Sequence, residues 1–431
     1  MSRFMLFVAA LCFVLPAAVV GDDWPQWRGP QRDGVWRETG IIDRFNGERL
    51  PAKWRMPIGP GYSGPTVAAG RVFVTDRQTS PQQAERVLCF DAATGKSLWT
   101  HSYGCAYAKI GYQAGPRACV TVESERAYAI GAMGHLFCLD VADGRVVWSH
   151  DCNVEYSIRM PEWGIAGAPL VVGGVVIVHI GGSDGACIVA FDKVTGREVW
   201  RALEDRAQYT PPTLIEQAGK QVVVCWTGDS VAGLSPTTGE LFWRVPLKPR
   251  NMPIGIATPI IDRDRLFVTS FYDGALMLRL KSDEVGVEQL WRRVGSSEQK
   301  TDALQSIIST PVFQDDHIYG VDSYGELRCL NATTGDRVWE DLSATPKIRW
   351  GTIHFVRHGE HWWMFNERGE LIIAKLSPRG FEPLSRTKLI DPTTDQLPRR
   401  DGVCWSHPAY ANRQIFIRND RELLSASLAA E

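Results

Sequence analysis

The chain has 431 residues, of which 44% are hydrophobic and 22% are charged, a balance typical of a folded globular protein. Its formal net charge is −2 and it contains no block of like charges, so neither nucleic acid nor an anionic membrane is an expected partner. It contains 16 tryptophans, an unusually high number, and many of them follow a repeat along the chain.

The first 21 residues have the pattern of a secretory signal peptide. Arg3 precedes a long apolar run, and small residues at positions 19–21 offer a cleavage point before Asp22. Because that run reaches the lower limit for crossing a bilayer, retention of the segment as an anchor is the alternative. No later stretch is long enough to span a membrane, so we expect a periplasmic or secreted protein without a transmembrane span in its mature chain.

A lead-in segment at residues 22–49 follows the signal. It contains DWPQWRGPQRDGVW at residues 23–36. The next stretch, LPAKWRMPIG at residues 50–59, places Trp54 in a strand that has no hairpin partner nearby in the sequence. This orphan strand needs a partner from elsewhere in the chain.

A motif then recurs about every 48 residues, the spacing expected of a repeat architecture. Its five good copies are CFDAATGKSLW, CLDVADGRVVW, AFDKVTGREVW, GLSPTTGELFW and CLNATTGDRVW, at residues 89–99, 138–148, 190–200, 233–243 and 329–339. The acidic residue and the Thr-Gly pair are turn formers, because Gly takes the positive φ that other residues resist. Each copy therefore predicts a β-hairpin with a Trp at a fixed offset.

Four strand-like segments fill each repeat, which predicts a β-propeller. Degenerate copies at 278–291 and 374–384 extend the series, and the last segment supplies only three strands. The strand around Trp54 would complete that last blade. We therefore predict an all-β, eight-bladed propeller of four-stranded antiparallel blades over residues 50–431, closed by the N-terminal strand. The alternative is a seven-bladed ring with an unrelated N-terminal extension. The tryptophans expected to pack between blades are Trp54, Trp99, Trp148, Trp200, Trp243, Trp291 and Trp339.

Nine cysteines remain after Cys12 leaves with the signal, an odd number that cannot pair completely within the chain. Cys89, Cys138 and Cys329 occupy the first motif position and are expected to be small buried residues. A bridge between Cys105 and Cys152 stays open. The sequence His358-Gly359-Glu360-His361 is expected to be a hairpin turn, and no metal site is predicted.

The motif resembles the pyrroloquinoline-quinone (PQQ) repeat family over about residues 50–428. That family includes quinoprotein alcohol dehydrogenases and the outer-membrane assembly lipoprotein BamB. The resemblance implies that each Trp docks onto the backbone of the next blade. For a dehydrogenase it also implies PQQ stacked on a Trp, calcium held by acidic and amide side chains, a disulfide between adjacent cysteines, and an Asp base. This chain has no Cys-Cys pair, and no residues match the calcium ligands or the base, so neither PQQ nor calcium is expected.

The sequence therefore predicts an extracytoplasmic, non-catalytic binding or scaffold protein, with cell-envelope protein assembly as one role. We expect a monomer whose partner is a protein or a cell-envelope ligand. The lipidation cysteine of BamB is missing here. A PQQ-dependent dehydrogenase is the alternative function.

The innermost strands of a propeller begin around one mouth of the central channel. The equivalent starting positions are Tyr62, Gln113, Ala166, Tyr209, Ile256, Ile308, Trp350 and Trp405. Aromatic residues with a few cations are typical of recognition sites. The predicted binding residues are Tyr62, Arg159, Tyr209, Arg349, Trp350 and Trp405. The alternative is that these rings only pack on one another and plug the channel.

Overall fold

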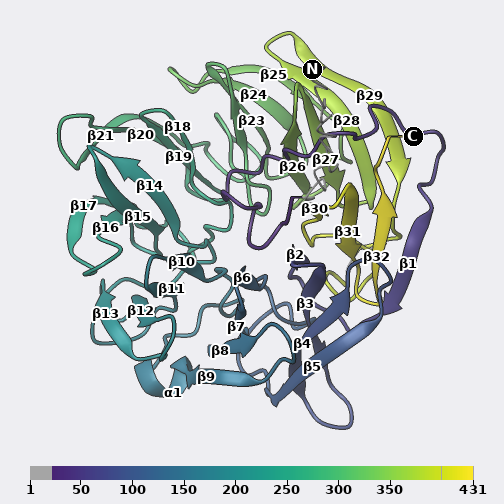
Figure 1. Cartoon of the computed structure of the whole chain (residues 1–431). Helices are drawn as coiled ribbons and strands as arrows, with labels where there is room; N and C mark the ends of the chain where they lie inside the picture. Colours follow the sequence, from purple (N-terminus) through teal and green to yellow (C-terminus); the bar gives the residue numbers. More distant parts are fainter. Residues whose placement is uncertain (1–21, 399, 431) are drawn as a thin grey trace, which may run out of the picture.

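The computed structural model describes residues 22–398 and 400–430, so the predicted signal peptide lies outside the described residues. Eight four-stranded antiparallel sheets stand in a ring around a central channel (Figure 1). The predicted eight-bladed propeller is therefore confirmed. The only helix in these ranges is the single turn α1 (Cys152–Tyr156), which directly follows strand β9.

Seven blades use consecutive strands, numbered from the channel outwards. The first four of these blades comprise β2 (Thr66–Ala68), β3 (Arg71–Gln78), β4 (Ala84–Asp91) and β5 (Ser97–Gly104); β6 (Thr121–Glu123), β7 (Arg126–Ile130), β8 (His135–Asp140) and β9 (Val146–Asp151); β10 (Leu170–Val172), β11 (Val175–His179), β12 (Ile188–Asp192) and β13 (Glu198–Ala202); β14 (Thr213–Gln217), β15 (Lys220–Trp226), β16 (Ser230–Leu234) and β17 (Leu241–Pro246). The next three comprise β18 (Ile260–Asp262), β19 (Arg265–Ser270), β20 (Gly274–Leu280) and β21 (Val287–Arg293); β22 (Val312–Gln314), β23 (His317–Val321), β24 (Leu327–Asn331) and β25 (Arg337–Asp341); β26 (Ile353–His358), β27 (His361–Asn366), β28 (Glu370–Ser377) and β29 (Gly380–Lys388).

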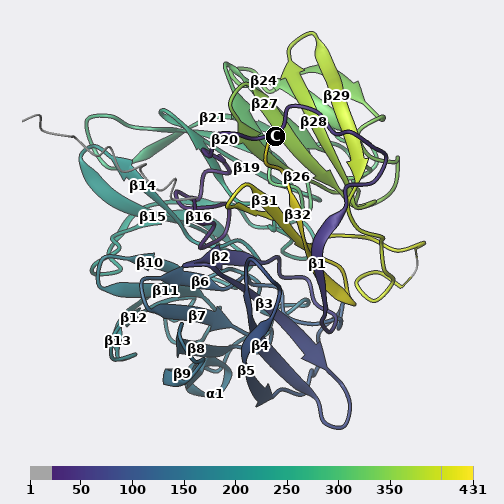
Figure 2. The ribbon, with the colours of Figure 1, turned by 45° about the vertical axis from the view of Figure 1, so that its right-hand side comes forward.

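The eighth blade joins the two ends of the propeller. It comprises β30 (Ala409–Ala411), β31 (Gln414–Arg418), β32 (Glu422–Ser427) and, as its outer strand, β1 (Ala52–Pro57). In the antiparallel register Trp54 lies opposite Ser425 (Figure 2). Closure by the N-terminal strand is thus confirmed, and the seven-bladed alternative is wrong. Pairing β1 with β32 gives the eighth blade four strands, as in the other blades, and joins the two ends of the propeller.

The repeat tryptophans pack between blades. Five of the seven are buried, and Trp291 and Trp339 are partly buried. Indole nitrogens donate to a carbonyl of the next blade in the pairs Trp54–Ala92, Trp99–Val141, Trp148–Lys193, Trp200–Pro236, Trp291–Ala332 and Trp339–Ser377. For Trp54, Trp99, Trp148, Trp200 and Trp291 the motif glycine of the next blade lies under the ring. At Gly144, with φ +75°, an added Cβ would come within 2.5 Å of Trp99, so both the backbone and the contact require glycine.

Trp243 departs from this pattern because the next blade lacks a good motif hairpin. Its indole nitrogen donates to Oε1 of Gln217 in its own blade, at 3.1 Å. The Nε2 of Gln217 in turn donates to the carbonyl of Lys281 in the next blade, at 3.3 Å. A glutamine side chain therefore relays a contact that the other tryptophans make directly.

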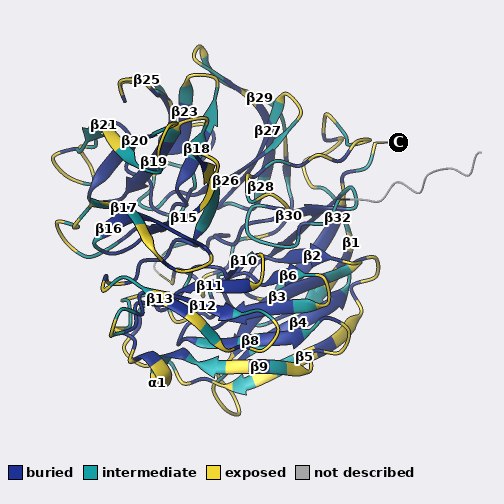
Figure 3. Cartoon of the chain, turned by 60° about the vertical axis from the view of Figure 1, so that its left-hand side comes forward, coloured by how far each residue is buried: buried dark blue, intermediate teal, exposed yellow. Residues whose placement is uncertain are grey.

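Burial is greatest in the middle strands of each blade and least in the outer ones (Figure 3). In β16 every residue is buried, whereas its outer neighbour β17 has only Trp243 buried. All nine described cysteines are free and buried, including Cys105 and Cys152, so the bridge between these two does not form. Cys89, Cys138 and Cys329 are fully buried, as their motif position predicts.

The lead-in segment lies across the central channel, where it is seen as the dark purple trace (Figure 1). Trp24 exchanges two backbone hydrogen bonds with Val67 of β2, at 2.8 and 2.9 Å. The backbone nitrogen of Trp36 donates to the carbonyl of Arg357 on β26, and Arg32 donates to the carbonyl of Pro169 beside β10. The segment therefore bonds to inner strands of several blades and occupies part of the channel.

Candidate functional site

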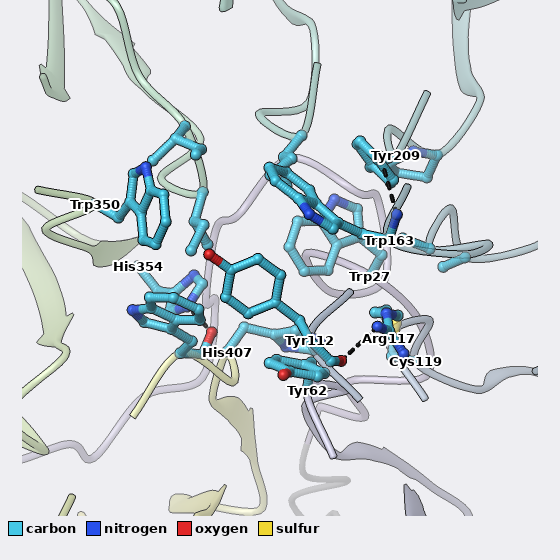
Figure 4. Close-up of a pocket in the computed structure, with 17 residues that line it drawn as sticks. Trp27, Tyr62, Tyr112, Arg117, Cys119, Trp163, Tyr209, Trp350, His354 and His407 are labelled. Carbon is cyan, nitrogen blue, oxygen red and sulfur yellow. Dashed lines mark hydrogen bonds between the residues drawn. The ribbon is translucent and has the colours of Figure 1, made fainter. Parts of the chain in front are cut away.

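A cavity of about 150 Å³ lies at the centre of the ring, and we call it the chamber. It is formed mainly by the loops that lead into the inner strands and by the lead-in segment (Figure 4). Seven aromatic residues line it: Trp27, Tyr62, Tyr112, Trp163, Tyr209, Trp350 and Trp405. The other lining residues are Arg117, Cys119, Ala166, Ala168, Pro211, Ile256, Ile307, Ile308, His354 and His407. The chamber is therefore largely apolar.

Four of the six predicted binding residues line the chamber: Tyr62, Tyr209, Trp350 and Trp405. Arg349 lies outside the lining. Its guanidinium lies over the Trp350 ring, 4.6 Å from the centroid, and forms an ion pair with Glu298 at 3.4 Å. Arg159 is exposed and outside the lining, and its backbone nitrogen donates to the carbonyl of Gly181. The structure thus brings the predicted aromatic residues together and leaves the two arginines apart.

Sequence reasoning missed several chamber residues. In the loop before β6, Tyr112 lines the chamber, whereas the predicted position was its neighbour Gln113. His407 stands two residues after Trp405, so both face the channel by the two-residue period of an extended chain. That period could have identified His407. Nothing in the repeat indicated Trp27, because it belongs to the lead-in.

Tyr112 joins the opposite walls of the chamber (Figure 4). Its ring makes edge contacts with Trp163 at 5.5 Å and with Trp350 at 5.8 Å between centroids. Trp405 lies 6.2 Å away from it. The guanidinium of Arg117 fixes the loop, because its Nη2 donates to the carbonyl of Tyr112 at 2.6 Å.

Two chamber residues have an unusual backbone conformation. Tyr112 has φ +52° and Trp350 has φ +67°, in the left-handed region that bulky side chains seldom occupy. The backbone nitrogen of Trp350 donates to the carbonyl of Ser323 at 2.8 Å, which helps to hold this conformation. Backbone strain of this kind gathers at functional sites.

The ionisable groups of the chamber are largely neutral. Burial lowers the pKa of His354 to about 4 and that of His407 to about 3, where the neighbouring His354 contributes as well. Burial also raises the pKa of Tyr62 and of Tyr209 well above the usual range. No Asp or Glu is among the lining residues. At neutral pH the lining therefore carries one charge, the guanidinium of Arg117.

A buried ion pair supports the wall that carries Trp350 and Trp405. The Nη2 of Arg400 donates to Oε1 of Glu367 at 2.6 Å, and its Nη1 donates to the carbonyl of Arg349 at 3.1 Å. The backbone nitrogen of Cys404 donates to the carbonyl of Glu367 at 2.8 Å. Burial raises the pKa of Glu367 to about 7, although Arg400 opposes the shift.

No cluster of three or more His, Cys, Asp or Glu side chains suited to a metal ion occurs within residues 22–398 and 400–430. The two histidines of the HGEH sequence flank a turn, since β26 ends at His358 and β27 begins at His361.

Within residues 22–398 and 400–430 no helix is long and apolar enough to cross a membrane.

The eight blades and the recurring Trp motif define a β-propeller of the PQQ-repeat class. The chain belongs to the family described as outer membrane protein assembly factor BamB, whose family model matches residues 38–151 and 83–341. Comparison with curated proteins gives no match.

Solved structures of two kinds share the fold. BamB from Moraxella catarrhalis is 15% identical, with a TM-score of 0.59, covering 89% of this chain and 98% of that one. Quinohemoprotein alcohol dehydrogenase from Comamonas testosteroni is 14% identical, with a TM-score of 0.63, covering 95% and 81%. A europium-containing methanol dehydrogenase is 12% identical, with a TM-score of 0.63, covering 92% and 89%. At these identities the likeness concerns the fold alone.

Proposed function

We propose that this protein is an extracytoplasmic, non-catalytic binding protein that receives an apolar group of its partner in the chamber. The observation that carries the proposal is the convergence of seven aromatic side chains, from the lead-in and from separate blade junctions, on one partly open cavity. Aromatic side chains supply much of the energy of recognition sites, and small-ligand sites are concave and mostly apolar. A channel plug would need no such cavity.

Membership of the BamB family favours a protein of the cell envelope as the partner. The family description names an assembly factor, so a scaffold role in envelope protein assembly follows as the biological setting. The predicted signal peptide supports an extracytoplasmic location. We further propose that the chain acts as a monomer, because the ring closes on itself through β1 and β32.

The chemistry of the chamber supports a role without catalysis. A general base works best with a pKa near the operating pH, whereas the pKa values of His354 and His407 are lowered to about 4 and about 3. No carboxylate lines the chamber. Nothing in the lining therefore offers an effective base near neutral pH.

The lining also does not fit a calcium-bound quinone. Calcium takes six to eight oxygen ligands, commonly from carboxylates and amides, and the lining contains no Asp, Glu, Asn or Gln. We therefore propose that neither PQQ nor calcium is a cofactor. The shared fold with alcohol dehydrogenases keeps a quinoprotein as the alternative to be tested.

The test uses the full mature chain as bait in an envelope extract. We expect the Trp350→Ala/Trp405→Ala variant to lose its captured partner and to keep the far-ultraviolet spectrum of the wild type. Arg159→Ala is the matched control, since Arg159 is exposed and lies outside the lining, and it should retain the partner.

A second arm adds PQQ, calcium and a primary alcohol to the wild-type chain with a redox dye. We expect no dye reduction above the rate without protein. Reduction that requires both PQQ and the protein would overturn the proposal in favour of the dehydrogenase. Retention of the partner by a folded chamber variant would place the binding site elsewhere.

A further inference from the structure

We propose that the chamber is a socket for a single phenolic ring, supplied either by a tyrosine side chain of the partner or by a free phenol. This inference rests on the proposed function of the chamber as the binding site. Its first support is size. A cavity of about 150 Å³ has room for a single benzene ring.

The second support is the arrangement of the walls. Trp163 and Tyr209 lie on one side and Trp350 on the other (Figure 4). Trp163 and Tyr209 stack on each other at 5.1 Å, and Trp350 meets Trp405 edge to face at 6.4 Å. Aromatic rings attract one another in both geometries. The ring of Tyr112 lies between these walls, so a guest ring that enters the chamber meets the aromatic surface of one wall and of Tyr112 itself.

The third support is an acceptor left without a donor. His407 lines the chamber and is only 8% exposed, and Trp27 packs edgewise on its ring at 4.6 Å. Its Nδ1 lies 3.4 Å from the carbonyl of Pro408, and because a carbonyl only accepts, we assign the proton to Nδ1. Its Nε2 then offers a lone pair, and it has no hydrogen-bond partner among the described residues. A phenolic O–H is a donor that completes this acceptor while the ring stays in apolar surroundings.

The charge of the chamber disfavours other aromatic ligands. The guanidinium of Arg117 excludes an ammonium group by repulsion. It is also a poor receptor for a carboxylate, because its two terminal nitrogens donate to the carbonyls of Gly111, Tyr112 and Gly115. Those bonds hold the loop that carries Tyr112. A neutral ring with one donor group is therefore the best match.

The test compares two probes that differ by one hydroxyl, para-fluorophenol and fluorobenzene, by fluorine NMR with the full mature chain. Water-to-apolar transfer alone favours fluorobenzene, so a preference for the phenol reports a hydrogen bond. We expect the wild type to prefer the phenol by about tenfold or more, and His407→Phe to lose that preference. His101→Phe is the matched control, because Nε2 of His101 is also buried without a partner but lies outside the chamber; it should keep the preference.

Nitrogen NMR of the wild-type histidines gives a readout that does not depend on a variant folding. The Nε2 signal of His407 should shift when para-fluorophenol is added and stay unchanged with fluorobenzene. Equal affinity of the two probes for the wild type, or an unchanged preference in folded His407→Phe, would overturn the inference.

The source of the ring is resolved by a second pair, N-acetyltyrosinamide and N-acetylphenylalaninamide. Preference for the tyrosine amide identifies a side chain of a partner, whereas binding of para-fluorophenol alone identifies a free phenol. Failure of this inference is separate from failure of the proposed function. If Trp350→Ala/Trp405→Ala loses its partner but the wild type shows no preference for the phenol, the proposed binding function stands and the phenolic guest is rejected. Phenol preference with capture unaffected in that variant supports the socket and places the partner site elsewhere.

Discussion

Tyr112 and Trp350 meet edge to face across the chamber, with ring centroids 5.8 Å apart and planes at 75°, and both have a left-handed backbone. They come from loops that lie far apart in the sequence. The carbonyl of Tyr112 is held by Arg117 and the nitrogen of Trp350 by Ser323. Two strained residues therefore place their rings against each other at the site that we propose for binding.

Replacing Tyr112 tests whether its left-handed backbone conformation is strained. We expect Tyr112→Gly to be more stable than Tyr112→Ala by about 1–2 kcal/mol, because only glycine adopts positive φ without steric cost. Denaturant unfolding of both variants measures the difference. At the neighbouring exposed Gln113, which does not have positive φ, the order should reverse. Alanine matching or exceeding glycine at position 112 would show that the loop relaxes.

The repeat tryptophans should contribute more to stability than the chamber tryptophans. Trp99 and Trp200 are 8% and 6% exposed and donate to backbone carbonyls of the next blade, so their replacement by Ala should cost about 3–5 kcal/mol. Trp163 is half-buried and borders an existing cavity, so Trp163→Ala should cost much less. Thermal unfolding of the three variants compares them, and equal melting temperatures would contradict the assignment.

The propeller could be predicted because each repeat is specified by short-range features of the sequence. Turn residues fix each hairpin, and the orphan strand at Trp54 has only one free place to pair, beside β32. The aromatic positions at the starts of inner strands follow from the same repeat. The loop of Tyr112 could not be predicted, because its path depends on bonds from Arg117 to backbone carbonyls and not on a pattern. The path of the lead-in, which brings Trp27 to the chamber, depends likewise on contacts with several distant blades.

Gln217 should be needed where the repeat is imperfect. Gln217→Ala leaves the indole nitrogen of Trp243 and the carbonyl of Lys281 without their shared partner, which should cost roughly 1–3 kcal/mol. Denaturant unfolding measures the loss. Glu216→Ala is the matched control, because Glu216 is adjacent and exposed, and it should change the free energy of unfolding little. A cost for Gln217→Ala no larger than that of the control would show that water replaces the relay.

Glu367 should make the protein less stable as pH rises towards neutrality. Burial raises the pKa of this carboxyl from 4.5 to about 7, so between these values the folded state holds a proton that the unfolded state has released. The contribution of Glu367 to stability is therefore greatest below about pH 4.5, falls as the pH rises, and levels off above about pH 7. The change should be on the order of 3 kcal/mol, because each pKa unit corresponds to about 1.4 kcal/mol and the value of about 7 already includes the opposing effect of Arg400.

Glu367→Gln should remove this pH dependence, because an amide does not titrate. The variant should be less stable overall, since Arg400 loses its buried partner, so the quantity to compare is the slope of the unfolding free energy between pH 4.5 and pH 7. His354 and His407, whose pKa values are lowered, give the opposite slope between about pH 4 and pH 6.5, but they do so in both proteins and cancel in the comparison. The free energy of unfolding of the wild type minus that of the variant should therefore decline as the pH rises from 4.5 to 7. A flat difference would mean that Glu367 is already ionised at pH 4.5, held by Arg400 against the effect of burial.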